Sequence, residues 1–268
     1  MPADYATYLG VSPSFPTDHH QAAAEAVVDY WALRPETQAV LLTCSCARGR
    51  AVPDSCVDMS IVVAPERLRA TQSAIWPRFE RYCRENAACQ ALKARVPWSA
   101  VDADLIDGTF SPGYHGYTSG ADDFELQVGN AIAWSRPLLR NGDRWERLQA
   151  EWLPYYGASR RDERMASILT FARNNIEHIA PYAARGLLHQ AHRRLLHASE
   201  EYLQALFISR RVYPIAYDKW IREQMVDILD EPAAYDQFHG LFALPSLDAH
   251  SLSHSAGTLS ELLDAITP

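Results

Sequence analysis

The sequence predicts an α+β protein in which a small mixed β-sheet with flanking helices precedes an all-helical bundle. Short apolar or alternating runs of strand length occur before about residue 141. Long stretches with apolar residues at helical spacing dominate after that point. We therefore expect one domain at 1–141 and a second at 142–268, a division that suits a chain of 268 residues.

The composition is that of a folded globular protein, with 48% hydrophobic and 22% charged residues. A net charge of −8 without a basic block disfavours binding to duplex nucleic acid through phosphate neutralisation. The first residues lack the basic and then apolar pattern of a secretory signal, and no run has the length of a membrane span. We therefore expect a cytoplasmic protein with no membrane partner, whose five cysteines are reduced thiols.

The elements of the first half follow from period and turn signals. Thr17 or Asp18 can cap a helix that should end near Arg34 and Pro35. Strands are expected at 39–43, 56–64 and 99–107, and a loop at 44–55 joins the first two. A charged helix at 65–93, kinked at Pro77, separates the second strand from the third. A turn-rich loop at 111–123 then leads to a fourth strand at 124–128.

The second half reads as helix throughout. Apolar residues recur at helical spacing over 160–179 and again over 187–206. Further helices are expected at 218–229, 233–242 and 258–266, and a polar linker at 246–257 precedes the last of them. These segments predict a helical bundle.

One segment in the first half carries residue types suited to nucleotide chemistry. A strand end, a turn of small residues, a basic residue and an acid on the next strand follow one another closely. Ser45 and the backbone N–H groups of the turn can donate to phosphate oxygens, Arg48 adds positive charge, and Asp58 can hold a cation. The plainer interpretation is that Ser45 and Arg48 are ordinary turn and surface residues, since a loop between strands often has this composition.

The spacing of this segment resembles the DNA polymerase beta-like nucleotidyltransferase superfamily, which includes the kanamycin and lincosamide nucleotidyltransferases. That family has Gly-Ser, then Ala-Arg-Gly, then Ser-Asp-x-Asp on the following strand. The stretches DDFELQVGN and ALFISRRVYPIAYDKWIREQ also look like segments of bacterial proteins with this domain and a helical C-terminal domain. The corresponding residues here are Cys44-Ser45, Ala47-Arg48-Gly49 and Ser55-Cys56-Val57-Asp58.

The resemblance implies a fold, a reaction and a set of site residues. It implies an α/β nucleotidyltransferase domain, a helical second domain, and Mg²⁺-dependent transfer of a nucleoside monophosphate from a nucleoside triphosphate. The acceptor would be a hydroxyl of an unknown small molecule or protein, and a homodimer is one assembly to test for. Ser45, Arg48 and Lys219 would bind the nucleotide, Asp58 and Asp104 the metal, and Asp58, Asp104 and Glu125 would form the catalytic set.

The chain departs from the family pattern at the first motif acid. Residues i and i+2 of a strand share a face, and here that pair is Cys56 and Asp58. A thiol is a soft ligand, whereas Mg²⁺ prefers oxygen. Compensation could come from Asp54, Ser60, Glu125, or a third-strand acid, Asp104 before Asp102. The alternative function is a degenerate, non-catalytic member that binds a nucleotide or a partner.

Two further patterns have a functional and a plain interpretation. Cys44, Cys46 and Cys56 suggest a thiolate metal site, but no fourth ligand follows at finger-like spacing, which favours small buried cysteines. Arg173 and His178 fit the Arg-x4-His pattern of helical ribonucleases in toxin and antitoxin pairs, and such a pair also arises by chance on a helix. A toxin–antitoxin component is therefore a third candidate function.

Overall fold

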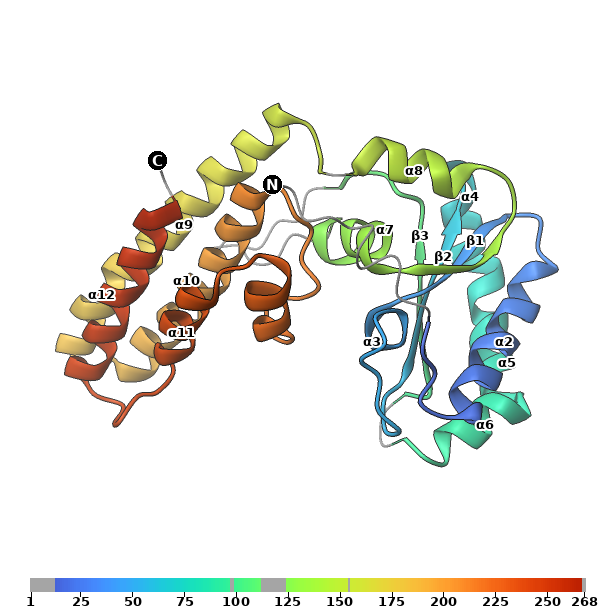
Figure 1. The fold of residues 1–268 in the computed structure, drawn as a ribbon, viewed down its shortest axis with the longest axis horizontal. Helices are drawn as coiled ribbons and strands as arrows, with labels where there is room; N and C mark the ends of the chain where they lie inside the picture. The colour runs from blue at the N-terminus through green and yellow to red at the C-terminus, as the bar shows by residue number, and fades with distance from the viewer. Residues whose placement is uncertain (1–12, 97–98, 112–123, 154, 267–268) are drawn as a thin grey trace. The chain divides into compact units, whose positions relative to one another are not determined.

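The computed structural model describes residues 13–96, 99–111, 124–153 and 155–266. Contacts between Cα atoms divide them into two compact units (Figure 1). The sheet unit holds the described residues up to 110 together with 127–153, and the helical unit holds 111, 124–126 and 155–266. The predicted fold class, a small mixed sheet followed by a helical region, is confirmed. The domain border at 141/142 stays a prediction.

The described residues of the sheet unit form a four-stranded mixed sheet in the order β3-β2-β1-β4. Its central pair is antiparallel, with Leu42 opposite Met59, whereas β2 and β3 run parallel, with Ser60 opposite Asp104. The outer strand β4 is antiparallel to β1. The strands are β1 (Thr37–Leu42), β2 (Val57–Val63), β3 (Val101–Ile106) and β4 (Arg136–Arg140).

One face of the sheet carries the larger apolar core. Helix α2 (Asp18–Ala32) packs there through Val27 and Trp31, against the Met59 and Ile61 side chains of β2. Alternation along the strand sends Met59 and Ile61 to this face, so Asp58 and Ser60 point to the other one. Helix α8 (Arg144–Trp152) contacts β1, and α7 (Asn130–Trp134) contacts α8 (Figure 1).

The helix predicted at 65–93 is interrupted rather than kinked once. A five-residue π-helix, Thr71–Ile75, lies just before the predicted kink at Pro77, which takes an early position in the helix that follows. A second interruption occurs at Asn86, whose extended backbone starts a new helix and whose side chain accepts from the N–H groups of Ala88 and Cys89. The resulting helices are α4 (Pro65–Ala70), α5 (Trp76–Glu85) and α6 (Ala87–Lys93).

The fourth strand predicted at 124–128 is wrong. That segment is the π-helix Phe124–Gly129, and the fourth strand is β4. Phe124 and Val128 are buried and four residues apart, which is helical spacing. The same pattern of apolar and polar residues also fits an alternating strand. The linker predicted at 246–257 is also corrected, since residues from Ala249 onward belong to α12 (Ala249–Ile266).

The helical unit is built on three long helices that contact one another: α9 (Ala158–Ala184), α10 (Leu188–Arg210) and α12. The predicted helices at 160–179 and 187–206 correspond to α9 and α10. Shorter elements complete the unit, namely the π-helix Glu223–Ile228 and α11 (Pro232–Gly240). Within the part of the chain that the structure describes, no helix is both long and apolar enough to span a membrane.

Candidate functional site

The segment after β1 is a tight turn and not an open loop. It forms the four-residue helix α3 (Cys44–Ala47) directly after the strand. The N–H of Thr43 donates to the carbonyl of Asp58 at 2.9 Å, so the turn is tied to β2. Cys44, which occupies the first glycine position of the resembled motif, has φ of 52°. This left-handed backbone favours glycine, so the turn keeps the conformation although the residue is cysteine.

Replacing Cys44 with glycine should therefore raise the free energy of unfolding by about 0.5–1 kcal/mol, because the left-handed strain on a residue with a Cβ is removed. Ala47 is the matched control, since it lies in the same short helix and is absent from the residues with positive φ. Ala47→Gly should lower the free energy of unfolding by about 1 kcal/mol. Urea unfolding of both variants measures the difference. Equal losses for the two variants would contradict the strain at Cys44.

The predicted phosphate ligands Ser45 and Arg48 are both buried, with 8% and 7% exposed surface. The terminal guanidinium nitrogens of Arg48 are closed off from solvent. The chain that precedes α2 runs beside this turn, because the N–H of Ser14 donates to the carbonyl of Cys46 at 3.1 Å. In this arrangement a phosphate has no direct path to the guanidinium, and the nucleotide role of both residues stays a prediction.

Asp58, Ser60 and Asp104 lie on one face of the sheet. Asp58 and Ser60 are two residues apart on β2, and Ser60 is in register with Asp104 on the parallel strand β3. Burial raises the pKa of Asp104 from 3.8 to about 6; the Ser60 hydrogen bond opposes this, and the charges of Asp102 and Asp58 add to it. The Oδ1 atom of Asp104 is buried and has no hydrogen-bond partner among the described residues.

Cys56 stands beside Asp58 as a hydrogen-bond donor. Its thiol donates to Oδ1 of Asp58 at 3.2 Å. Burial, and then the charge of Asp58, raise the pKa of Cys56 to about 12. The same two causes raise the pKa of Cys46, whose thiol donates to the carbonyl of Cys56 at 3.8 Å, to about 12. Both thiols are therefore protonated at neutral pH, when they are poor metal ligands.

A histidine that sequence reasoning missed holds the loop in front of β2. His20 on α2 has no exposed surface, and its Nε2 lies 2.9 Å from the carbonyl oxygen of Ser55. Since a carbonyl only accepts, Nε2 carries the proton and Nδ1 accepts from the hydroxyl of Thr17 at 2.7 Å. The sequence feature that could have indicated this contact is the spacing of Thr17 and His20 at the start of a helix. The contact fixes the backbone one residue before Cys56.

Glu125 lies in the helical unit, inside a buried polar cluster. Its carboxylate has no exposed surface and accepts hydrogen bonds from the hydroxyls of Tyr155 at 3.1 Å, Tyr156 at 2.7 Å and Tyr217 at 2.8 Å. The guanidinium of Arg164 lies 3.7 Å away. Burial and the charge of Glu125 raise the pKa of Tyr155 and of Tyr217 well above 10, so both hydroxyls stay protonated as donors. These surroundings favour a structural role, and the catalytic role of Glu125 stays a prediction.

The remaining predicted residues lie in the helical unit. Lys219 is exposed, and its carbonyl accepts from the buried side chain of Gln224 at 3.0 Å. Arg173 forms an exposed ion pair with Asp264 at 3.7 Å. His178 lies with Nδ1 2.7 Å from the carbonyl oxygen of Asn174, one turn earlier on α9. The contacts of Arg173 and His178 are ordinary helix-surface contacts and do not favour the ribonuclease interpretation.

The acids on β2 and β3 are the candidate ligands for Mg²⁺. Among the described residues, no group of three or more His, Cys, Asp or Glu side chains is placed to hold a metal ion. However, Mg²⁺ is usually held by one or two carboxylates, with water and substrate phosphates completing its octahedron. Asp58 and Asp104 place two hard carboxylate oxygens on one face, and Oδ1 of Asp104, which has no partner within the described part of the chain, suits a cation. The donor set fits a site that substrate completes.

Comparison with known proteins gives a loose likeness. No family model matches this chain, and no curated protein does. Among solved structures, this chain is similar to a nucleotidyltransferase-like protein from Exiguobacterium sibiricum 255-15. The two share 13% identity with a TM-score of 0.45, and the match covers 91% of this chain and 74% of that chain.

Proposed function

We propose that this chain is a nucleotidyltransferase that transfers a nucleoside monophosphate from a nucleoside triphosphate to a hydroxyl of a small molecule or a protein, with Mg²⁺. One observation carries the proposal: Asp58 and Asp104 share a face of the sheet beside α3, and Oδ1 of Asp104 is buried without a partner among the described residues. A buried carboxylate with a raised pKa costs folding free energy, so it is better explained by a ligand than by stability.

In this proposal Asp58 and Asp104 would hold the cation, which would offset negative charge on the phosphates of the bound nucleotide. Asp104, with a pKa of about 6, is mostly ionised at neutral pH and is therefore available as an oxygen ligand for a cation. Ser60 donates a hydrogen bond that favours the ionised form of Asp104. Ser45 and Arg48 would bind the triphosphate once their surroundings open, and a nucleotide-binding role for Lys219 in the helical unit stays a prediction.

The second candidate is a non-catalytic nucleotide binder, which one observation favours. Cys56 stands in the place of a motif acid, and its thiol is protonated and donates to Oδ1 of Asp58. A protein of this kind would bind nucleotide without a metal requirement.

Calorimetric titration with each Mg²⁺–nucleoside triphosphate tests the proposal. The wild type should bind a triphosphate in a Mg²⁺-dependent way. Asp58→Asn should weaken that binding at least about tenfold, the lower limit seen when a residue that only supports a metal ligand is removed. Glu66→Gln is the control, because Glu66 is exposed in the first turn of α4, after the far end of β2, and should leave binding unchanged.

The variant Cys56→Asp separates the two candidates. The transferase proposal fails if the wild type binds triphosphate only without metal, or not at all, while Cys56→Asp gains Mg²⁺-dependent binding. The chain would then be the non-catalytic candidate. If the wild type already shows Mg²⁺-dependent binding that Asp58→Asn removes, incubation with hydroxyl acceptors should release pyrophosphate. That release is the reaction's direct readout.

A further inference from the structure

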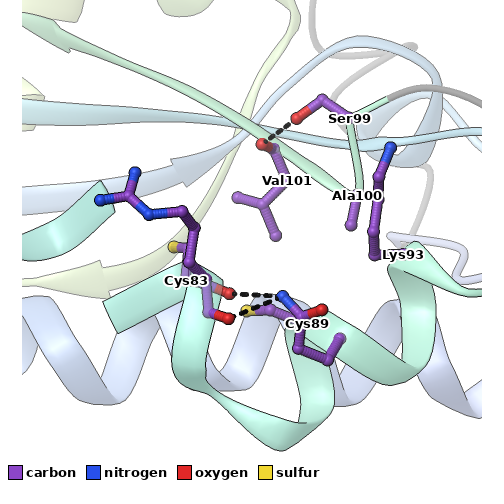
Figure 2. Close-up of a pocket in the computed structure, with 8 residues that line it drawn as sticks. Cys83, Cys89, Lys93, Ser99, Ala100 and Val101 are labelled. Carbon is purple, nitrogen blue, oxygen red and sulfur yellow. Dashed lines mark hydrogen bonds between the residues drawn. The ribbon is translucent and has the colours of Figure 1, made fainter. Parts of the chain in front are cut away.

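A pocket of about 720 Å³ lies in the sheet unit, at the corner between α5 and α6. Its volume is in the range of small-molecule sites. Figure 2 shows Cys83 and Cys89 on the helical side of the pocket, with the chain at Ser99–Val101 across from them. Arg84 and Lys93 also line it, and both are exposed. The described lining therefore contains two cations and no acid.

The two thiols lie close together across the corner. Cys83 is in the last turn of α5 and Cys89 in the first turn of α6, and both side chains border the same pocket. The interaction between the two thiols raises the pKa of Cys83 and lowers that of Cys89, so Cys89 is the readier thiolate. Cys83 is half-buried and Cys89 is buried.

The backbone around the pair is held firmly. Asn86 caps α6 by accepting from the N–H groups of Ala88 and Cys89. Its own side chain donates to the hydroxyl of Tyr82 at 3.0 Å. Gln90 donates to the carbonyls of Cys83 at 3.5 Å and of Arg84 at 2.9 Å. Such a corner keeps two thiols near each other without a covalent bond, which lowers the entropy cost of joining them.

We propose that Cys83 and Cys89 form a reversible dithiol–disulfide site, oxidised by a small disulfide that carries carboxylates and binds in the adjoining pocket. Two thiols on one pocket wall and two cations around it match the two halves of such a ligand: a disulfide to exchange and carboxylates to pair with Arg84 and Lys93. This site is separate from the acids on β2 and β3, and it does not depend on the proposed nucleotidyl transfer.

The exchange balances in two steps. The Cys89 thiolate attacks one sulfur of the small disulfide, so a mixed disulfide forms and one small thiolate leaves, which takes the proton of Cys83. The Cys83 thiolate then attacks the Cys89 sulfur, so the protein disulfide forms and the second small thiolate leaves. That thiolate takes the proton that Cys89 had released to solvent. The pair loses two electrons, and the small disulfide is reduced to two thiols.

Glutathione disulfide is the probe for the experiment. The reduced full chain is incubated with graded mixtures of glutathione and glutathione disulfide, then blocked, digested and analysed by mass spectrometry. We expect a peptide pair joined at Cys83 and Cys89, reversible by excess glutathione. Cys83→Ser should instead accumulate the mixed disulfide at Cys89. Cys44→Ser, a half-buried cysteine outside the pocket, should leave the joined pair unchanged.

The cationic side of the pocket has its own test. The double variant Arg84→Gln, Lys93→Gln should slow oxidation by glutathione disulfide about tenfold, the lower end for loss of electrostatic attraction. Its rate with the uncharged hydroxyethyl disulfide should not change. A wild type in which Cys83 and Cys89 stay unmodified while other cysteines react, or in which only mixed disulfides form, overturns the proposal. Because the wild type alone decides this, a variant that fails to fold leaves the test intact.

Discussion

Glu125→Ala should lower the free energy of unfolding of the helical unit by about 3–5 kcal/mol, which is the usual loss when one partner of a buried charge pair is removed. The carboxylate has no exposed surface and accepts from three tyrosine hydroxyls, with the Arg164 guanidinium 3.7 Å away. Without it, these donors stay buried without their acceptor. Thermal or urea unfolding followed by circular dichroism measures the change.

Two variants separate the charge of Glu125 from its hydrogen bonds. Glu125→Gln keeps one acceptor oxygen of similar shape and removes the charge, so its loss should be smaller than that of Glu125→Ala. Tyr155→Phe removes a single hydroxyl of the cluster and should cost about 1 kcal/mol. If Glu125→Ala is as stable as the wild type, the carboxylate does not hold this cluster together, and its predicted catalytic role regains support.

The position of Glu125 also shows where sequence reasoning reached its limit. The residue pattern of 124–128 fits an alternating strand. In such a strand, Glu125 would lie on the face opposite Phe124 and Val128. The structure buries all three residues, because Tyr155 and Tyr217, which lie 30 and 92 residues along the chain, supply donors for the carboxylate. Contacts between residues so far apart in the chain cannot be recognised from a short stretch of sequence. The hydrophobic period of 124–128 alone could therefore not distinguish a helix from a strand.

The missed strand β4 has a different cause. Pro137 lies inside it, and a proline within an apolar run argues against a strand. The argument fails here because β4 is an edge strand of the sheet, where one side of the backbone needs no partner. The register between β1 and β4 also shifts between Val40 and Leu41, next to the proline. Central strands β1 and β2 carry no such residue, and their short apolar and β-branched runs predicted them correctly.

The acids on β2 and β3 were the predictable part of the candidate site. Asp58 and Asp104 lie on strands that the apolar pattern identifies, and alternation puts each on a definite face. The burial of Arg48 and the hydrogen bond between Cys56 and Asp58 depend on packing around α3, which the motif spacing does not contain. Sequence therefore predicted that Asp58 and Ser60 share a face, whereas Asp104 was placed beside them by the family resemblance. It did not predict which of these side chains are accessible.

Asp104→Asn should make the protein more stable at neutral pH. The pKa of Asp104 in the folded protein is about 6 and its reference value 3.8, so the folded state binds the proton more tightly than the unfolded chain. Stability from this group is therefore present in full below about pH 4 and is lost as pH rises through about 6. A difference of about two units corresponds to roughly 1–3 kcal/mol, which the neutral amide should recover at pH 8.

The gain should disappear at low pH, where Asp104 is already protonated, so urea unfolding of wild type and variant at pH 8 and at pH 4 provides the test. Asp102→Asn, at an exposed neighbour on β3, is the matched control and should change stability by less than about 0.5 kcal/mol. A gain of equal size at both pH values would show that the amide improves packing and that the charge of Asp104 carries no cost.

The variant Asp104→Asn also tests whether Asp104 binds a cation in the wild type. If Asp104 holds a cation in the wild type, Mg²⁺ with a triphosphate should stabilise the wild type against unfolding, because a ligand bound only to the folded state adds to its stability. Asp104→Asn should then start from a higher stability and gain nothing from the ligand. If the wild type gains nothing either, Asp104 does not hold a cation with a triphosphate, and the proposed nucleotidyl transfer loses the observation that carries it.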